Sequence, residues 1–498
     1  MSIRTIVENG FEGIIAEIEC QTSRGLPSII IVGFATKAVD EAKERIRGAF
    51  SCLPVEFPKR RITINLAPAD VPKEHASFDL AIAVSILEAS QFIPTVSPDT
   101  AFFGELGLDG SLRPVRGLIG KLMSAKAHGL STVFIPTPNA EQAKLIDGLI
   151  IYSFEDLSQV YQQLTGVQMQ PAIVKASTVP ATVAISSIDF ADVAGQEQAK
   201  RALTIAAAGR HNILLNGPPG TGKSMLAKAL VSVLPPMNRT EILETTHIHS
   251  LRGKDYQTIV TVRPFRSPHH SASETSIIGG GQKPRPGEIS LANHGILFLD
   301  EFPEFKRNVI ESLRQPLEDR VITLSRAHDS LHLPANFILI ATANPCPCGY
   351  WGTDKNCTCQ LAQLNNYRRK LSGPIMDRID VYVSVENVQH TKLLEKNTGP
   401  ITTRQIAGQV NQAIARQHTR FGRTKYNSEM TNKEVKQLTK LDSEARSLLD
   451  RGAEKLELSP RAYMRTLKVA RTIADIDGSE TIAAQQIAEA LQYRPILP

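Results

Sequence analysis

The stretch HNILLNGPPGTGKSMLAKAL, from His211 to Leu230, decides the fold class of this chain. It contains the pattern G-x-x-x-x-G-K-S from Gly217 to Ser224, after the apolar run Ile213 to Leu215 and before the helical pattern Met225 to Leu230. A glycine-rich loop between a strand and a helix is the context in which this pattern binds phosphate. A chance match in a glycine-rich turn is the alternative, but both flanks favour a phosphate-binding loop. The stretch therefore predicts an α/β fold.

The loop residues have separate parts in the expected chemistry. Gly220 and Gly222 allow backbone N–H groups to converge on phosphate oxygens, and the start of the helix adds a positive dipole end. Lys223 is expected to reach the β- and γ-phosphates, and the Ser224 hydroxyl to bind Mg²⁺. The expected cofactors are ATP and Mg²⁺. The residues expected to contact the nucleotide are Gly217, Pro218, Pro219, Gly220, Thr221, Gly222, Lys223, Ser224 and Met225.

Two other apolar runs end in polar side chains. The run HGILFLDEF, residues 294–302, ends with Asp300 and Glu301. We expect Asp300 to hold the Mg²⁺ shell and Glu301 to orient and deprotonate the attacking water; two solvated acids at a strand end are the alternative. Asn344 follows the run Phe337 to Ala341, so we expect its amide at the γ-phosphate or at the water.

Two arginines are candidates for stabilising the charge of the transition state. Arg378, in SGPIMDRID, is expected to act on the nucleotide of a neighbouring subunit. Arg461 lies at the start of a predicted helix, Ser459 to Ile476, and is expected to contact phosphate. For each arginine alone, a surface salt bridge is the alternative.

Four of the six cysteines lie in one short run after Asn344. Two C-x-C pairs are separated by a segment with two glycines, and four thiolates from one loop can close a tetrahedral zinc site. A closed site of this kind would be structural, and free thiols or a labile disulfide are the alternatives. The candidate ligands are Cys346, Cys348, Cys357 and Cys359. His269 and His270 lack an evident third ligand, so we expect a structural or subunit-contact role for them.

The length of 498 residues indicates two or three domains. We predict an N-terminal domain at 1–165, a linker at 166–187, a P-loop core at 188–390 and a C-terminal helical lid at 391–498. The net charge of +6 does not by itself indicate a nucleic-acid partner. The first residues lack a signal-peptide pattern and no run reaches the length of a membrane span, so we expect a cytoplasmic protein without membrane contact.

Five segments together carry a resemblance to a known family: GQEQAKRAL, RPFRSPHH, PRPGEISLANHGILFLDEF, ATANPCPCGY and LSGPIMDRID. They resemble the magnesium-chelatase-like branch of the AAA+ ATPases and, within it, the bacterial ComM/YifB family, over nearly the whole chain. The resemblance implies a homo-hexameric ring motor that uses ATP to unwind DNA and migrate branches in natural transformation. Magnesium-chelatase subunits, which act in metal insertion, are the nearest alternative, but they have no N-terminal region of this kind.

The resemblance also assigns roles to single residues. Lys223 and Ser224 match Walker A, and Asp300 and Glu301 match Walker B. The other matches are Asn344 with sensor 1, Arg378 with the arginine finger, Arg461 with sensor 2 and Gln196 with the segment that flanks the adenine.

Two loops are candidates for sequence-independent contacts to DNA. The segment Val321 to Phe337 reads as a hairpin at the place where the resembling families have a pore hairpin, with Arg326 and His328 at its tip. Arg252 and Lys254, after the P-loop helix, are expected to line the same pore. Plain surface loops are the alternative.

The N-terminal region resembles the Lon-protease type of fold, of the ribosomal S5 domain 2-like class, in PKEHASFDLAIA and in FFGELGLDGSLRPVRGLIGKLMSAKAHGLSTVFIP. Placed against the Lon motif, Ser77 falls at the nucleophile and Lys121 at its base, which leaves an ATP-dependent Ser/Lys protease as a further alternative. Phe78 and Asp79 replace the small residues of that motif and are expected to crowd a substrate cleft.

Overall fold

The computed structural model forms two compact units. The first unit comprises residues 1–180, 238–261 and 325–332, and the second comprises 181–237, 262–324 and 333–498. The described residues are 2–9, 11–33, 37–69, 76–167, 172–175, 188–253, 256–281, 285–325, 330–352, 355–370, 374–387 and 402–495.

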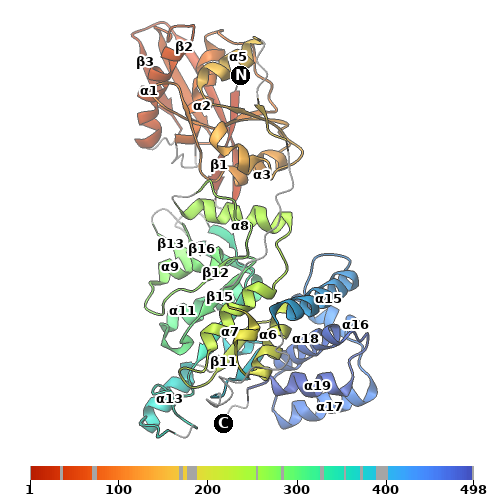
Figure 1. The fold of residues 1–498 in the computed structure, drawn as a ribbon. Coiled ribbons are helices and arrows are strands. Elements are labelled where there is room, and N and C mark those ends of the chain that lie inside the picture. Colours follow the sequence, from red (N-terminus) through yellow and green to blue (C-terminus); the bar gives the residue numbers. More distant parts are fainter. Residues whose placement is uncertain are drawn as a thin grey trace. The chain divides into compact units, whose positions relative to one another are not determined.

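The first unit is built on an eight-stranded mixed sheet (Figure 1). Strands β1, β2 and β4 pair antiparallel, whereas β5, β8 and β9 run parallel to one another. Alternate residues of β4 are buried, which is the pattern of a strand with one face on a core. The strand order is β10 (Ala172–Ile173), β9 (Ile150–Phe154), β8 (Thr132–Pro136), β5 (Thr100–Phe102), β1 (Ser2–Asn9), β2 (Glu12–Ser23), β4 (Arg61–Ala67), β3 (Ser28–Val32).

The helices of the first unit pack against this sheet. Helix α2 is apolar on nearly all sides, and all but its last two residues are buried. The main helices are α1 (Lys37–Ala49), α2 (Asp79–Ala89), α3 (Leu118–Ala127), α5 (Leu157–Thr165) and α8 (Arg239–Arg252).

Helix α8 belongs to the first unit, although it follows the P-loop helix in the sequence. Its buried His247 lies with Nε2 3.1 Å from the Phe11 carbonyl oxygen. A Cβ at Gly120 of α3 would come within 2.2 Å of His247 Cε1, so this close approach of α3 and α8 requires glycine.

The second unit contains a five-stranded sheet in which all the strands are parallel. The strands β15 (Ile296–Leu299) and β18 (Ile338–Ala343) are short apolar runs buried on both faces, as expected where helices cover a parallel sheet. This confirms the predicted α/β class. The order is β12 (Phe265–Arg266), β15 (Ile296–Leu299), β18 (Ile338–Ala343), β11 (Ile213–Asn216), β19 (Val381–Ser384). The helices of this part include α6 (Glu197–Gly209), α7 (Lys223–Ala229), α9 (Glu274–Ile278), α11 (Arg307–Ser312), α12 (Arg314–Asp319) and α13 (Leu361–Lys370); β16 (Val321–Ser325) pairs with β17 (Ser330–Pro334).

The C-terminal part of the second unit is helical, and it packs beside α6 (blue in Figure 1). One apolar core joins these helices to the sheet. Ser459 caps α18, because its hydroxyl accepts from the Ala462 N–H, and Gly478 follows the helix with φ 80°. The helices are α15 (Thr403–Phe421), α16 (Asn432–Leu438), α17 (Ser443–Lys455), α18 (Pro460–Asp477) and α19 (Ala484–Gln492). Among the described helices, none is long and apolar enough to cross a bilayer.

Candidate functional site

The carboxyl edge of the parallel sheet gathers the residues that the sequence singles out for nucleotide chemistry. Strand β11 lies next to β18, and β18 lies next to β15. Because parallel strands end at the same edge, the P-loop after β11, Asp300 after β15 and Asn344 after β18 become neighbours.

Lys223 lies buried within the loop itself. Its Nζ donates to the carbonyl oxygens of Gly217 at 2.7 Å and Pro218 at 2.8 Å, and to Asn344 Oδ1 at 3.2 Å. Burial lowers the pKa of Lys223, while the carboxylate of Asp300 acts in the opposite direction. A phosphate would therefore offer this ammonium a stronger, charge-assisted partner than the carbonyl groups.

Ser224 and Asp300 form a pair of oxygen donors that fits Mg²⁺. Ser224 Oγ donates to Asp300 Oδ2 at 3.0 Å, so both oxygens lie where one cation can reach them. Thr342, which the sequence reasoning missed, donates to Asp300 Oδ1 at 2.6 Å and accepts from the backbone N–H of Glu301 at 2.9 Å. Thr342 lies in β18, two residues before Asn344, and residues two apart along a strand point to the same face. This spacing was the sequence signal that could have identified Thr342.

Glu301 has a second neighbour that the sequence did not connect to it. His270 Nδ1 lies 3.7 Å from Glu301 Oε2, and the His270 ring packs on that of His269 with centroids 4.1 Å apart. The Glu301 side chain is 53% exposed, and its backbone is left-handed with φ 54°. The Glu301 carboxylate is therefore accessible to solvent, while the hydrogen bond from its backbone N–H to Thr342 fixes the start of the side chain. This arrangement suits an acid that must contact a water molecule.

Gln196 and Met225 lie at the margins of this edge. Gln196 precedes α6 with φ 60°, and its Nε2 donates to the carbonyl oxygen of Glu386, just beyond the end of β19. Met225 is partly buried and packs on the core that the sheet shares with the helices.

Arg378 and Arg461 lie together at the other edge of the sheet. Arg378 lies three residues before the first residue of β19, its side chain is 8% exposed, and its Nη2 lies 2.6 Å from Glu318 Oε1. Arg461 Nη1 lies 3.6 Å from the same Glu318 oxygen. The hydrogen bond from Arg378 and the charges of both arginines lower the pKa of Glu318. The strands separate these arginines from their own P-loop by about 13 Å, at roughly 3.3 Å per residue.

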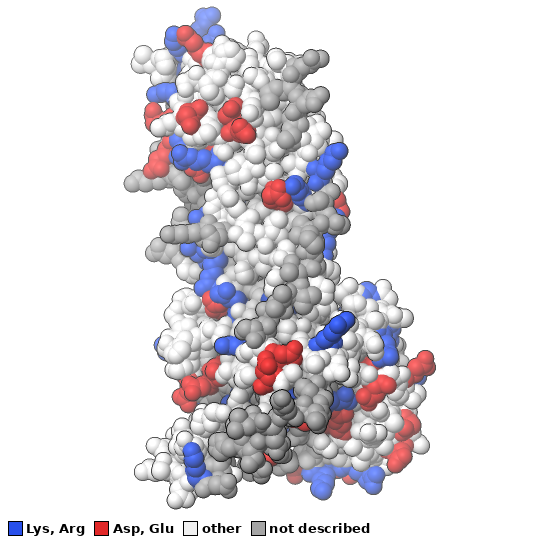
Figure 2. All heavy atoms as spheres, in the orientation of Figure 1, with Lys and Arg blue, Asp and Glu red and all other residues white. Residues whose placement is uncertain are grey.

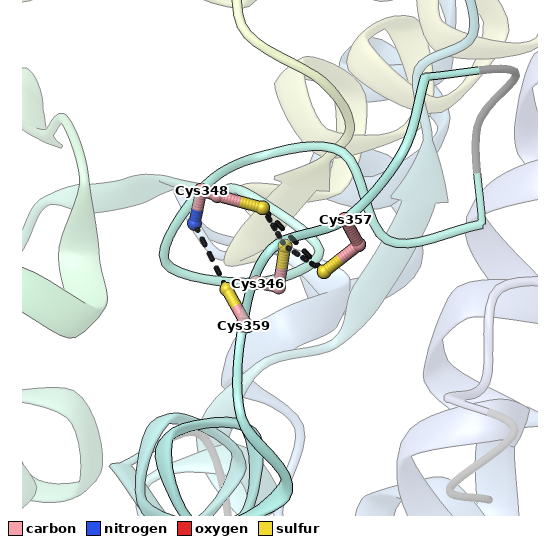
Figure 3. A group of neighbouring side chains, drawn as sticks. All are labelled: Cys346, Cys348, Cys357 and Cys359. Carbon is pink, nitrogen blue, oxygen red and sulfur yellow. Dashed lines mark hydrogen bonds between the residues drawn. The ribbon is translucent and has the colours of Figure 1, made fainter.

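The four cysteines form one cluster, as Figure 3 shows. All the Sγ atoms lie within 4.8 Å of one another, and the Cys346–Cys348 and Cys348–Cys357 pairs are 3.3 and 3.5 Å apart. Tetrahedral zinc with bonds of about 2.3 Å needs sulfur separations of about 3.8 Å, so the cluster fits a Cys₄ site. Hydrogen bonding, first from the Tyr350 backbone, lowers the pKa of Cys348 to about 6, whereas burial raises the pKa of Cys359 to about 12.

The cysteine loop and the helix α13 that follows it approach the candidate nucleotide site at two places. Gly349 has φ 85°, and a Cβ there would come within 2.7 Å of Pro219 Cδ, so the two loops are in close contact. Tyr367 of α13 accepts from the Asn344 backbone N–H at 3.3 Å, and burial raises the pKa of this tyrosine. Sequence spacing alone predicted neither contact.

The protease alternative finds little support in the first unit. Lys121 is buried and its Nζ lies 2.8 Å from Glu8, and among the described residues no hydrogen bond joins Lys121 to Ser77. Phe78 does not crowd a cleft as expected, since it lies in the apolar core, and Asp79 is buried beside Arg45 at 2.8 Å.

The residues predicted to contact DNA lie mostly outside the described residues: Lys254, Arg326 and His328. Arg252 is half-buried at the end of α8 in the first unit. On the face shown in Figure 2, the described basic and acidic side chains are intermixed rather than gathered in one basic stripe. The DNA contacts therefore stay predictions.

Comparison with known proteins places this geometry in a family. Three models match successive parts of the chain: "Subunit ChlI of Mg-chelatase" at residues 18–139, "Magnesium chelatase, subunit ChlI" at 189–393 and its C-terminal model at 401–494. The competence protein ComM of Haemophilus influenzae is 42% identical over 98% of this chain and 96% of its own length. The chain belongs to the ComM/YifB family.

Other relatives agree with this placement. YifB of Escherichia coli, an uncharacterized protein, is 41% identical over 96% of this chain and 94% of its own length. The magnesium-chelatase 38 kDa subunit of Rhodobacter capsulatus is 26% identical over only 36% of this chain. The chain thus shares its full length with the ComM/YifB proteins and only a part with that chelatase subunit, and the predicted AAA+-type core with a C-terminal helical domain is confirmed.

Proposed function

We propose that this member of the ComM/YifB family is an ATP-driven hexameric ring motor that moves branched or single-stranded DNA. The observation that carries the proposal is the division of the catalytic set between opposite edges of one sheet. Lys223, Asp300 and Glu301 lie at the carboxyl edge, and Arg378 lies at the amino edge. One chain therefore supplies half of two different sites.

The carboxyl edge performs the hydrolytic part of the cycle. Lys223 exchanges its carbonyl partners for the β- and γ-phosphates of ATP, and Asn344, its third partner, moves to the γ-phosphate or the water. Ser224 and Asp300 would hold Mg²⁺, which would neutralise phosphate charge. Glu301 accepts a proton from the attacking water, and Thr342 fixes the backbone from which Glu301 projects.

The amino edge serves the next subunit. Arg378 leaves Glu318 to meet the γ-phosphate of a neighbouring nucleotide, where its charge stabilises the transition state. Arg461 pairs with the same Glu318 carboxylate and also leaves it to contact phosphate of the neighbouring nucleotide. A head-to-tail contact of this kind closes into a ring, and six subunits are what the family resemblance implies.

DNA as the substrate rests on the relatives rather than on a basic surface. The relative from Haemophilus influenzae is named a competence protein, and competence requires handling of incoming DNA. The direct test is migration of a labelled three-strand junction by the purified protein with ATP, alongside Glu301→Gln. Strand exchange that needs ATP and fails in the variant supports the proposal. ATP hydrolysis without strand movement would return the chelatase alternative, which porphyrin metallation would test.

The cysteine cluster is proposed as a structural zinc site. A metal bound by all four sulfurs leaves no open position, so it orders a loop that has little apolar core of its own. Because Gly349 lies against Pro219, a movement of the nucleotide loop would also move the cysteine loop. A zinc ion held by the four cysteines would order the loop between Pro219 and the exposed Trp351.

A further inference from the structure

Helix α13 leads from the cysteine cluster to the candidate nucleotide site. It begins at Leu361, two residues after Cys359, the last of the four clustered cysteines. Two of its side chains, Leu364 and Tyr367, are buried, and residues three apart lie on the same face of a helix. The hydroxyl of Tyr367 reaches the backbone N–H of Asn344, one residue beyond the end of β18. The buried face of α13 therefore carries a polar group to the carboxyl edge of the sheet.

Asn344 has one hydrogen-bond partner on each of two elements. Its backbone N–H donates to Tyr367 Oη at 3.3 Å, and its side-chain Oδ1 accepts from Lys223 Nζ at 3.2 Å. The sheet does not hold Asn344, because the ladder between β11 and β18 ends at Ala343. The residue after it is Pro345, which has no N–H group to donate. In the described part of the chain, the hydrogen bond that orients the Asn344 N–H is therefore the one to Tyr367.

Tyr367 accepts this bond as a neutral hydroxyl. The residue is 6% exposed, and burial is the main cause that raises the pKa of its phenol. The negative charges of Glu304 and Glu301 act in the same direction. A neutral hydroxyl can accept from an N–H group, whereas the ring of phenylalanine cannot. Replacement of Tyr367 by phenylalanine thus removes the bond to Asn344 and keeps the buried ring.

The C-terminal end of α13 contacts the segment that follows β15. Lys370 Nζ donates to the Pro303 carbonyl oxygen at 2.8 Å. Pro303 is buried and lies two residues after Glu301. Because Tyr367 and Lys370 are three residues apart, they are neighbours on the surface of the helix. One helix therefore contacts both the end of the strand that precedes Asn344 and the turn that follows Glu301.

The two contacts of α13 have a consequence for ATP hydrolysis. In the proposed function, on which the inference rests, Asn344 acts at the γ-phosphate or the attacking water, and Glu301 accepts the proton of that water. Both groups must keep their distance to the reacting atoms, because a misplacement of about 1 Å can cost a hundredfold in rate. We infer that Tyr367 is a positioning residue, which sets the place of the Asn344 amide by binding its backbone N–H. Lys370 ties the turn after Glu301 to the same helix.

Steady-state ATPase kinetics of Tyr367→Phe test the inference. The variant should lose about five- to tenfold in kcat and keep KM for ATP within about twofold, because Lys223 and the phosphate loop are unchanged. The matched control is Tyr493→Phe, which should keep the wild-type kcat. Tyr493 is 3% exposed, and its hydroxyl donates to Glu489 Oε1 of α19 at 3.2 Å. A kcat of Tyr367→Phe equal to that of the wild type would overturn the inference.

A second variant shows whether Tyr367 acts through Asn344. Asn344→Ala removes the side-chain amide but keeps the backbone N–H that binds Tyr367. In this background, Tyr367→Phe should change kcat by less than about twofold, because the group that it positions is gone. An equal loss in both backgrounds would give Tyr367 a separate role and overturn the inference. Lys370→Ala should lower kcat in both backgrounds, because it acts on the turn after Glu301, and an unchanged kcat would overturn the part of Lys370.

Hydrogen exchange gives a readout that does not depend on ATP hydrolysis. In Tyr367→Phe, the Asn344 amide loses its partner, so a peptide that spans residues 340–350 should exchange about tenfold faster at one amide. Tyr493→Phe should leave this peptide unchanged, and unchanged exchange in Tyr367→Phe would overturn the inference. A wild-type protein without ATPase activity would refute the proposed function and, with it, the positioning role, even where exchange confirms the contact. ATP hydrolysis that moves no DNA would refute the DNA motor and leave the positioning role standing.

Discussion

The two edges of the parallel sheet in the second unit differ in how their chemistry is encoded. At the carboxyl edge, the groups follow strand ends in short continuous motifs, and Lys223, Asp300 and Asn344 converge as those motifs predict. At the amino edge, Arg378 and Arg461 come from segments far apart in the chain and meet at Glu318. In the function proposed above, one edge of this sheet holds the nucleotide, while the other meets the phosphate of a neighbour's nucleotide.

Loss of the amino-edge arginine is expected to have the largest effect. Arg378→Ala should lower kcat for ATP hydrolysis by about 10³-fold or more, because the transition state loses its positive charge. ATP binding to the variant, measured by titration of a fluorescent analogue, should stay close to the wild-type value. The matched control is Arg307→Ala, whose side chain is 90% exposed on α11. Equal loss in both variants would contradict the assignment.

Replacement of Glu301, the acid at the carboxyl edge, is expected to have the second-largest effect on ATP hydrolysis. Glu301→Gln should lower kcat by about 10²- to 10⁴-fold with ATP still bound, because the amide cannot accept the proton of the water. His270→Ala should cost about tenfold, since the imidazole lies beside the carboxylate without reaching the phosphate. His269→Ala is the matched control and should have a smaller effect. Steady-state ATPase assays measure all three, and a His269 effect equal to that of His270 would count against the positioning role.

The cysteine cluster lies against the carboxyl edge of the sheet, so its removal tests that edge separately from the amino edge. Purified wild-type protein should contain one zinc ion per chain by elemental analysis, and Cys357→Ser/Cys359→Ser should contain none. The double variant should lose several-fold in kcat, since the loop that packs on Pro219 is no longer ordered. Cys20→Ser, in the first unit, serves as the control. Full metal loss with unchanged turnover would leave the site structural but uncoupled from ATP.

Thr342 gives the smallest expected effect. Thr342→Val removes a buried hydroxyl that donates to Asp300 and accepts from the Glu301 backbone. Each partner then lacks a hydrogen bond, so the free energy of unfolding should fall by about 1–3 kcal/mol. Urea titration followed by circular dichroism measures this change, and Thr342→Ser should recover most of it. A loss as large in the serine variant would point to packing of the methyl group instead.

The sequence predicted the carboxyl edge well because each motif there is continuous and its residues follow the strands in a fixed spacing. It predicted the fold class and the Cys₄ cluster for the same reason. It did not reveal the contact of His270 with Glu301, because that contact depends on how a loop turns after β12. A cavity at the amino edge could not be predicted, because the cations that line it directly follow α6 and α12 or lie on α18 and meet only in the folded chain. The placement of α8 in the first unit likewise depends on packing rather than on sequence order.

The central claim, that the two edges of one sheet serve two different nucleotides, is tested most directly by mixing inactive variants. Glu301→Gln subunits retain Arg378, and Arg378→Ala subunits retain Glu301, so neighbours of the two kinds assemble complete sites at their shared contact. Each variant alone should be nearly inactive, whereas an equimolar mixture, assembled at random, should regain up to about a quarter of the wild-type ATPase rate. A mixture that stays as inactive as its components, although mixed rings are shown to form, would contradict the account.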